Sequence, residues 1–429
     1  MPDPDDAPGA VGAPAPWAQH RRTPVAPILA AVVVGGATGA LMVGVQRVVV
    51  LGLLDRVADA PLPVLALCPF VGLVLAALCL RFIAGGATPS IADEYIRNVH
   101  DPAPLDLRPV PGRLLASMST IGLGGALGLE GVAVYVGGAI GTIVESRLGR
   151  RLRTEDAKML MVVGAAAGVA AIFQTPVTGA VFALEVPFRG RLSRRHVVPI
   201  LAGSMAGYVA AILIVGRQPL FPVRGHVSLD APDLVAALVI GALVGVVAHG
   251  FSRLVLLAKA GVRRVPVGVR VPAAGAVIGG VVVIAARITD VRVVLGPGYD
   301  ATRWALDPTH AAGLVLGVLV LRMTATTVAL GGGGVGGLSI PLVSIGALTG
   351  RAASGIAGRA GDPLDTVVGA AAFLAAGYRV PLAGIAFVAE TTGRVGYIVP
   401  AMLAVFAADT VIGRASVSTE QRDDAEAGW

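Results

Sequence analysis

The sequence predicts an all-α, polytopic membrane protein, and three observations support this class. The 429 residues are 55% hydrophobic and only 14% charged, whereas a soluble domain carries about 25% charged residues. Apolar runs of spanning length, about 20 residues, recur along the chain, and residues 159–184 and 323–350 contain no charged side chain. Glycine-rich stretches interrupt two of the runs. Because lipid offers no partner to a backbone group, helices are the expected spanning element.

The chain is expected to divide into two membrane repeats flanked by polar ends. The Pro- and Asp-rich start resembles a disordered tail, and Arg21–Arg22 before the first apolar run places the N-terminus in the cytoplasm by the positive-inside rule. The expected regions are a tail at 1–25, a first repeat at 26–215, a linker at 216–232, a second repeat at 233–413 and a short cytoplasmic tail at 414–429.

Each apolar run predicts one helix or a pair of helices. In the first half the runs cover residues 27–54, 63–81, 112–144, 159–184 and 197–215. In the second half they cover residues 233–251, 271–285, 311–350, 364–377 and 380–413.

The formal net charge of +7 does not indicate a nucleic-acid partner. The basic residues gather in two loops, 147–158 and 189–195, which is typical of cytoplasmic anchoring beside anionic lipid. Six His without ligand spacing, and Cys68 and Cys79 inside an apolar run, predict no metal and no cofactor. Without a nucleophile–base arrangement or a phosphate-binding loop, the chain is not expected to be an enzyme.

The two halves resemble each other at an offset of 205 residues. Residues 164–186 (GAAAGVAAIFQTPVTGAVFALEV) match 369–391 (GAAAFLAAGYRVPLAGIAFVAET) at eight positions, including the Pro, the Phe and the last Glu. This offset is expected to hold without insertions across the repeat. It places Glu130 opposite Val335, so the acid is expected in one half only. Internal repeats are typical of transporters, whose substrate site lies between the halves.

The stretches GALGLEG and GGGGVGGLSIP are predicted to break the membrane helices, because Gly disfavours a helix interior. New helices should begin near Gly131 or Val132 and near Ser339–Pro341. Helix N-termini meeting inside the membrane would form an anion site from backbone N–H groups. The alternative is close packing through small residues, which we favour for Gly137, Gly138 and Gly141.

Glu130 is predicted to gate such a site. The ionised carboxylate would occupy the anion position and the protonated form would leave it, since intramembrane acids are usually functional. The alternative is a pair with an Arg from another segment. Glu185 and Glu390, which end both repeat units, are instead expected to bind backbone N–H groups of a neighbouring segment.

The motifs GLEGVAVYVGGAIG, GVGGLSIP and GVAAIFQTPVTGAVFALE resemble those of the CLC family of chloride channels and chloride/proton exchangers, over about residues 30–415. The resemblance implies two inverted repeats with broken and partly spanning helices, a homodimer with one pore per subunit in the bacterial inner membrane, both termini cytoplasmic, and Glu130 as the gate. The backbone amides expected to bind the anion are those of Gly128, Leu129, Gly131, Gly337, Leu338, Ser339 and Ile340.

Several positions depart from the family pattern. Ala87 in GATPS stands where the family has the Ser of its central anion site, and Val417 stands near the place of the central Tyr. Val186 occupies the position of the inner proton-transfer Glu. Ser339 and Val132 replace a Phe and a Pro of the motifs.

These departures lead to three hypotheses. The first is passive or weakly coupled transport of chloride or another small monovalent anion, because an inner acid is missing. The alternative is an anion/proton antiporter with a different inner relay. A remote alternative is a membrane scaffold or sensor that no longer transports.

Overall fold

The computed structural model describes residues 25–152, 158–189, 196–217, 221–223, 230–359 and 362–423, without the side chains of 149–152. The predicted N-terminal tail, much of the linker and most of the two basic loops lie outside these residues. Within them the chain is helical, and its only bridged backbone pairs outside helices are Gly128 with Gly337 and Phe188 with Arg422. The predicted all-α class is confirmed.

Most helices of the first half coincide with the first five predicted apolar runs. A long helix of the first run continues through a π-helical segment, and the fourth run divides into two short helices. The elements are α1 (Val25–Gln46), η2 (Arg47–Leu54), α2 (Asp55–Ala58), α3 (Leu62–Leu78), η3 (Cys79–Ile83), α4 (Ile91–His100), α5 (Val110–Gly122), α6 (Glu130–Leu152), α7 (Met159–Phe173), α8 (Pro176–Glu185) and α9 (Val197–Val215).

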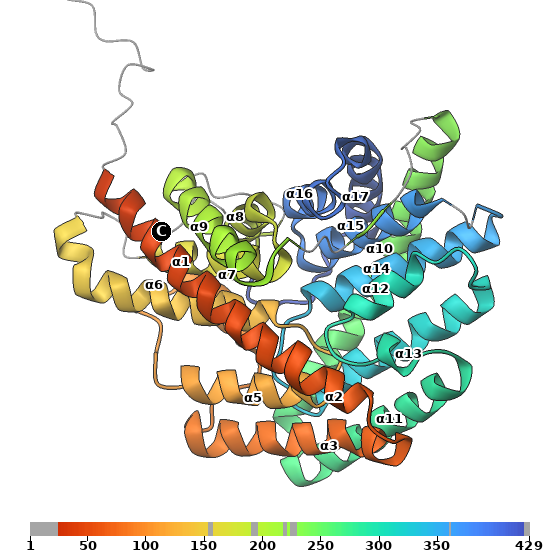
Figure 1. Cartoon of the computed structure of the whole chain (residues 1–429), viewed down its shortest axis with the longest axis horizontal. Helices are drawn as coiled ribbons and strands as arrows, with labels where there is room; N and C mark the ends of the chain where they lie inside the picture. Colours follow the sequence, from red (N-terminus) through yellow and green to blue (C-terminus); the bar gives the residue numbers. More distant parts are fainter. Residues whose placement is uncertain are drawn as a thin grey trace, which may run out of the picture.

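The second half repeats this order. Its elements are α10 (Ala231–Arg264), α11 (Val267–Ile288), η4 (Val291–Val293), α12 (Tyr299–Ala305), α13 (Ala312–Gly331), α14 (Ser339–Ile356), α15 (Pro363–Tyr378), α16 (Pro381–Thr392), η5 (Val395–Tyr397) and α17 (Ile398–Ile412). Figure 1 shows α3, α5 and α11 side by side at one end of the molecule, where α3 packs against both neighbours.

Within the described residues, seven helical segments are long and apolar enough to cross a membrane. They are Val25–Ala58, Leu62–Ile83, Val197–Val215, Ala231–Arg264, Val267–Ile288, Ala312–Gly331 and Val395–Ile412. The apolar helices α7, α8 and α15 are shorter, as expected for broken elements. Their breaks have a local cause, because a left-handed residue, Gln174 or Arg379, ends the first helix and a Pro begins the second.

The register of the repeat differs from the single offset that the sequence indicated. The offset of 205 is correct for α7–α8 against α15–α16, where Gln174 corresponds to Arg379. For α5–α6 against α13–α14 it is 209, since α6 begins at Glu130 and α14 at Ser339. The left-handed Gly124 and Gly333 are also 209 apart. The first half therefore has four extra residues between these helix pairs, and Glu130 corresponds to Ser339 rather than to Val335.

The two halves are joined by crosswise hydrogen bonds at α8 and α16. The Glu185 carboxylate accepts from the backbone N–H groups of Leu382 (3.1 Å) and Ala383 (2.9 Å). The Glu390 carboxylate accepts from those of Val177 (2.8 Å) and Thr178 (2.7 Å). Each carboxylate thus satisfies the free N–H groups at the start of the other half's helix, which confirms the structural role predicted for both acids.

Close helix packing explains the glycines inside α6. A Cβ on Gly137 would lie 2.1 Å from the carbonyl oxygen of Gly164, and one on Gly141 would lie 1.9 Å from that of Leu160. The packing role favoured for these glycines is therefore confirmed for Gly137 and Gly141. At Gly138 the nearest atom would be at 3.4 Å, an ordinary contact.

Candidate functional site

The loops that precede α6 and α14 bind each other through their backbones. The Gly128 N–H donates to the Gly337 carbonyl (2.9 Å), and the Gly337 N–H donates to the Gly128 carbonyl (2.7 Å). The two glycine-rich breaks therefore place both helix N-termini together inside the molecule. The N–H groups of Gly128 and Gly337 were both expected to bind an anion, but in this conformation each is already bonded to the carbonyl of the other glycine.

The Glu130 carboxylate lies between these two loops. The side chain is only 1% exposed, and its Oε1 accepts from the Ile340 N–H in the first turn of α14 (3.2 Å). Its Oε2 has no hydrogen-bond partner among the described residues. A Cβ on Gly128 would lie 2.0 Å from Oε2, and one on Gly337 would lie 2.7 Å from Oε1. The absence of side chains at both glycines therefore makes the space that the carboxylate fills.

This arrangement is that of an anion bound at a helix N-terminus. Free N–H groups and the helix dipole favour negative charge there, and the bound anion is the protein's own carboxylate. The prediction of one starting helix was one residue late, since α6 begins at Glu130 itself, while α14 begins at Ser339 as predicted.

The other predicted amide donors border different pockets. Gly131 and Ser339 line a small pocket that also contains Glu130, Val186 and Tyr378, here called the Glu130 pocket. Leu338 lines a second pocket described below. Leu129 is fully buried, and its carbonyl accepts from the Ala133 N–H inside α6.

The alternative of a Glu130–Arg pair receives only indirect support. Arg322 in α13 is fully buried and acts electrostatically on Glu130. Its guanidinium, however, donates to the backbone carbonyls of residues 295–297, at 3.2 Å for Leu295 and 2.9 Å for Gly296. No ion pair between the two residues occurs in the described part of the chain, so Arg322 contributes positive potential without holding the carboxylate.

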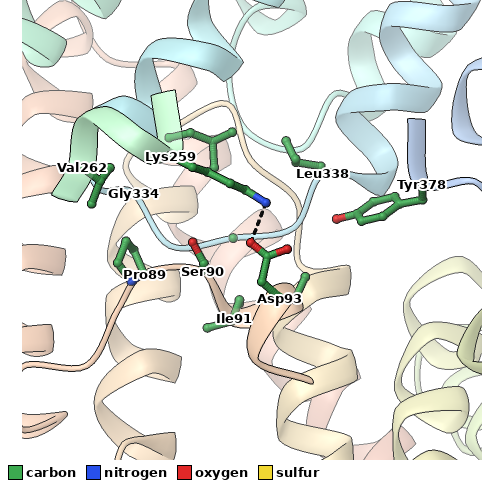
Figure 2. Close-up of a pocket in the computed structure, with 12 residues that line it drawn as sticks. Pro89, Ser90, Ile91, Asp93, Lys259, Val262, Gly334, Leu338 and Tyr378 are labelled. Atoms are coloured by element: carbon green, nitrogen blue, oxygen red, sulfur yellow. Dashed lines mark hydrogen bonds and ion pairs between the residues drawn. The ribbon is translucent and has the colours of Figure 1, made fainter. Parts of the chain in front are cut away.

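A second pocket lies beside the start of α4. Figure 2 shows it bordered by Ser90, Asp93, Lys259, Leu338 and Tyr378, and we call it the Lys259 pocket. The Lys259 Nζ lies 2.6 Å from the Asp93 Oδ2 and donates to the Val417 carbonyl (2.8 Å). Both halves contribute to this pocket, since Asp93 belongs to α4 and Lys259 to α10.

The residues at the degenerate family positions do not form one group. Ala87 and Val417 line neither pocket, and Ser90, three residues after Ala87, borders the Lys259 pocket instead. Val417 is fully buried and its N–H donates to the Gly377 carbonyl (2.9 Å). Val186 does line the Glu130 pocket, and its carbonyl accepts from the Gln421 side chain (2.9 Å).

Tyr378 is the residue that sequence reasoning missed. It ends α15, is 3% exposed, and lines both pockets. Its oxygen faces the Leu338 N–H, and Figure 2 shows the hydroxyl pointing into the Lys259 pocket. The available signal was the repeat itself, because Phe173 in the first half corresponds to Tyr378 in the second, so a hydroxyl is added in one half only.

The comparisons with known proteins agree with this geometry. The sequence profile of the family described as voltage gated chloride channel matches residues 71–413. The chain belongs to the CLC family. A relative from Citrobacter koseri, named H(+)/Cl(-) exchange transporter ClcA, is 29% identical over 408 residues, which cover 90% of this chain and 85% of the relative. A ClcA from Salmonella arizonae is 28% identical with the same coverage.

Solved structures share the CLC fold. A slow cyanobacterial Cl-/H+ antiporter superposes with a TM-score of 0.77 at 21% identity, covering 90% of this chain and 94% of the other. A CLC-type fluoride/proton antiporter gives 0.77 at 23% identity, covering 93% and 98%. This CLC chain is thus a multi-pass membrane protein of an ion-transport family. The predicted family membership and CLC-like fold are confirmed.

Proposed function

We propose that this CLC protein transports chloride or another small monovalent anion in exchange for protons, with Glu130 as the gate. The observation that carries the proposal is the position of the Glu130 carboxylate, buried at the N-terminus of α14 and bonded to the Ile340 N–H. A free anion of similar size would need the same donors. Transport would therefore require the carboxylate to leave.

Proton coupling would follow from the same competition. The ionised carboxylate is held by the helix N-terminus, and protonation removes the charge that holds it there. The neutral side chain then leaves, an anion occupies the vacated position, and the proton moves with the carboxyl group. Release of the proton would restore the charged form, which displaces the anion again.

Exchange is the better-supported alternative of our two transport hypotheses. The passive reading rested on Val186, which lacks the acid expected at that position. The relatives compared above are named as exchange transporters or antiporters, which favours coupled transport with a different inner relay. Tyr378 borders both pockets, so its hydroxyl is a candidate member of that relay and a candidate anion donor beside the Leu338 amide.

Purified protein in liposomes tests this function. An imposed chloride gradient should drive uphill proton movement in the wild type, and Glu130→Gln should abolish that movement because the amide cannot carry a proton. Anion flux through Glu130→Gln should also lose its dependence on pH. Proton flux equal to that of empty vesicles, with chloride flux intact, would instead establish the passive hypothesis. Vesicles without any anion flux would support the scaffold hypothesis.

We also propose the assembly and location implied by the family. A homodimer in the bacterial inner membrane, with both termini in the cytoplasm, fits the apolar side chains exposed on α9 and α17, among them Leu213 and Phe406. Cross-linking in membranes and protease protection of terminal tags would test these two points separately.

A further inference from the structure

A third cavity, which we call the Arg47 cavity, has no part in the proposed function. It encloses about 370 Å³, within the range of about 300–1,000 Å³ that is usual for small-molecule sites. The two pockets beside Glu130 and Lys259 enclose only about 10 Å³ and 20 Å³. A halide ion does not need the room of the Arg47 cavity, so its size indicates an organic ligand.

Both halves of the chain form the wall of the Arg47 cavity. In the first half its lining positions recur in pairs every four residues, at 46–47, 50–51 and 54–55, so one face of the α1–η2–α2 stretch borders it together with the ends of α7 and α9. The second half contributes α12 and the residues before it. The η2 part of the wall is π-helical, and π-helical segments occur frequently at functional sites.

Arg47 is the charged side chain of this wall that has no ion pair in the described part of the chain. The other charged side chains of the wall are paired, Asp55 with Arg292 at 3.1 Å and Asp300 with Arg303 at 3.6 Å. The Arg47 guanidinium donates to the Ile214 carbonyl, which leaves most of its five N–H groups for other acceptors. A planar guanidinium can bind a carboxylate through two parallel hydrogen bonds.

Backbone carbonyls around the Arg47 cavity are already bonded to donors of the protein. At the end of α9 the Ile214 carbonyl accepts from Arg47, and the Gly216 carbonyl accepts from the Gln174 side chain (2.9 Å). In the second half the carbonyls of residues 295–297 accept from Arg322. These acceptors are not available to a cation, whereas donors of Arg47 remain. The hydrogen bonding therefore favours an acidic ligand over a basic one.

We infer that the Arg47 cavity binds a small organic carboxylate. The guanidinium of Arg47 binds the carboxylate group, and the apolar side chains of Ile172 and Phe173 contact the hydrocarbon part of the ligand. Tyr299 also lines the cavity and lies within electrostatic range of Glu130, so the bound ligand lies close to the proposed gate. The inference concerns binding and does not depend on transport.

Calorimetric titration of the purified full-length protein in detergent tests the site, with sodium benzoate as the probe at constant sodium chloride. Benzamide has the same ring without the charge and should bind at least about tenfold more weakly than benzoate. Arg47→Gln should weaken benzoate binding by about 10- to 150-fold, the loss expected for a hydrogen bond between charged groups. In this variant benzoate and benzamide should bind alike.

Arg56→Gln is the matched control. Arg56 lies in α2, which continues the same helical stretch, and it also donates to a backbone carbonyl, that of Gly52, but it does not line the cavity. Its affinity for benzoate should equal that of the wild type. The inference would be overturned by a wild type that binds no benzoate or binds benzamide equally well, or by Arg47→Gln with wild-type affinity.

A second variant covers the case in which Arg47→Gln does not fold. Val50 lines the cavity one turn after Arg47, and Val50→Phe fills part of the space without changing the charge. It should weaken benzoate binding at least about tenfold, and unchanged affinity would contradict the site. Liposome assays separate this inference from the proposed function. Exchange without Arg47-dependent benzoate binding would refute the site alone, and such binding without exchange would refute the proposed function alone.

Discussion

Replacement of Gly128 by Ala should expel the Glu130 carboxylate from its position at α14. The new Cβ would lie 2.0 Å from Oε2 and 2.4 Å from Oε1, and its three nearest atoms all belong to the carboxyl group. Since a carbon–oxygen contact needs about 3.3 Å, the carboxylate must move by more than about 1 Å. Gly128 is not among the positive-φ residues, so the backbone accepts Ala without strain.

The displacement removes the hydrogen bond from the Ile340 N–H. A hydrogen bond to a charged group contributes about 1.5–3 kcal/mol, which corresponds to a shift of about 10- to 150-fold toward the conformation with the carboxylate displaced. Chloride flux at neutral pH should therefore rise toward the value that the wild type reaches in acid. The flux of the variant should also depend less on pH.

Chloride efflux from liposomes at neutral and acidic pH measures both effects. Gly138→Ala is the matched control, because its Cβ would meet its nearest atom at 3.4 Å in the same region of the chain, and it should behave as the wild type does. A folded Gly128→Ala protein with the flux and pH profile of the wild type would refute the reasoning, since the carboxylate would then leave or stay independently of the space it fills.

Two further substitutions test other contacts. Tyr378→Phe removes one hydroxyl beside the Leu338 amide and should weaken chloride binding about tenfold, measured by calorimetry, while wild-type affinity would exclude Tyr378 as a donor. Glu390→Gln should lower the free energy of unfolding by about 1.5–3 kcal/mol, because Val177 and Thr178 donate to different carboxylate oxygens and Gln replaces one of these with an NH2 donor. Thermal melting in detergent checks this, with Glu420→Gln as the control, because the ion pair of Glu420 with Arg97 (3.3 Å) is partly exposed and should contribute little. Equal melting temperatures of Glu390→Gln and the wild type would contradict the capping role.

The fold class could be predicted because hydropathy is a local property. The hydrophobicity of each spanning run is enough to indicate that it lies in lipid. The breaks between helices follow from the positions of Gly and Pro, so α14 begins at Ser339, as Pro341 indicated. The register of the repeat could not be predicted in the same way. Residues 331–337 contain six glycines, so the sequence does not fix which of them corresponds to a given glycine of the first half. The folded chain does, through the helix starts at Glu130 and Ser339 and the pairing of Gly128 with Gly337.

The sequence predicted the acid at the centre of the site, Glu130, but not the residues around it. Glu130 stands out because a charge in an apolar run needs a reason, and that logic requires no tertiary information. Tyr378 and Lys259 gave no such signal, since a Tyr at a helix end and a Lys in a long helix are ordinary. Ala87 and Val417 were singled out because they occupy the family's anion-site positions. In the described structure the side-chain hydroxyl groups that border the Lys259 pocket belong instead to Ser90 and Tyr378.

The crosswise bonds of Glu185 and Glu390 have a consequence for biosynthesis. The start of α8 is completed by a residue 212 positions later in the chain. At a synthesis rate of about 5–20 residues per second, the ribosome needs about 10–40 seconds to supply it. Throughout that interval the N–H groups of Val177 and Thr178 lack the Glu390 carboxylate, so the start of α8 needs another hydrogen-bond acceptor, such as water, until the second half is in place.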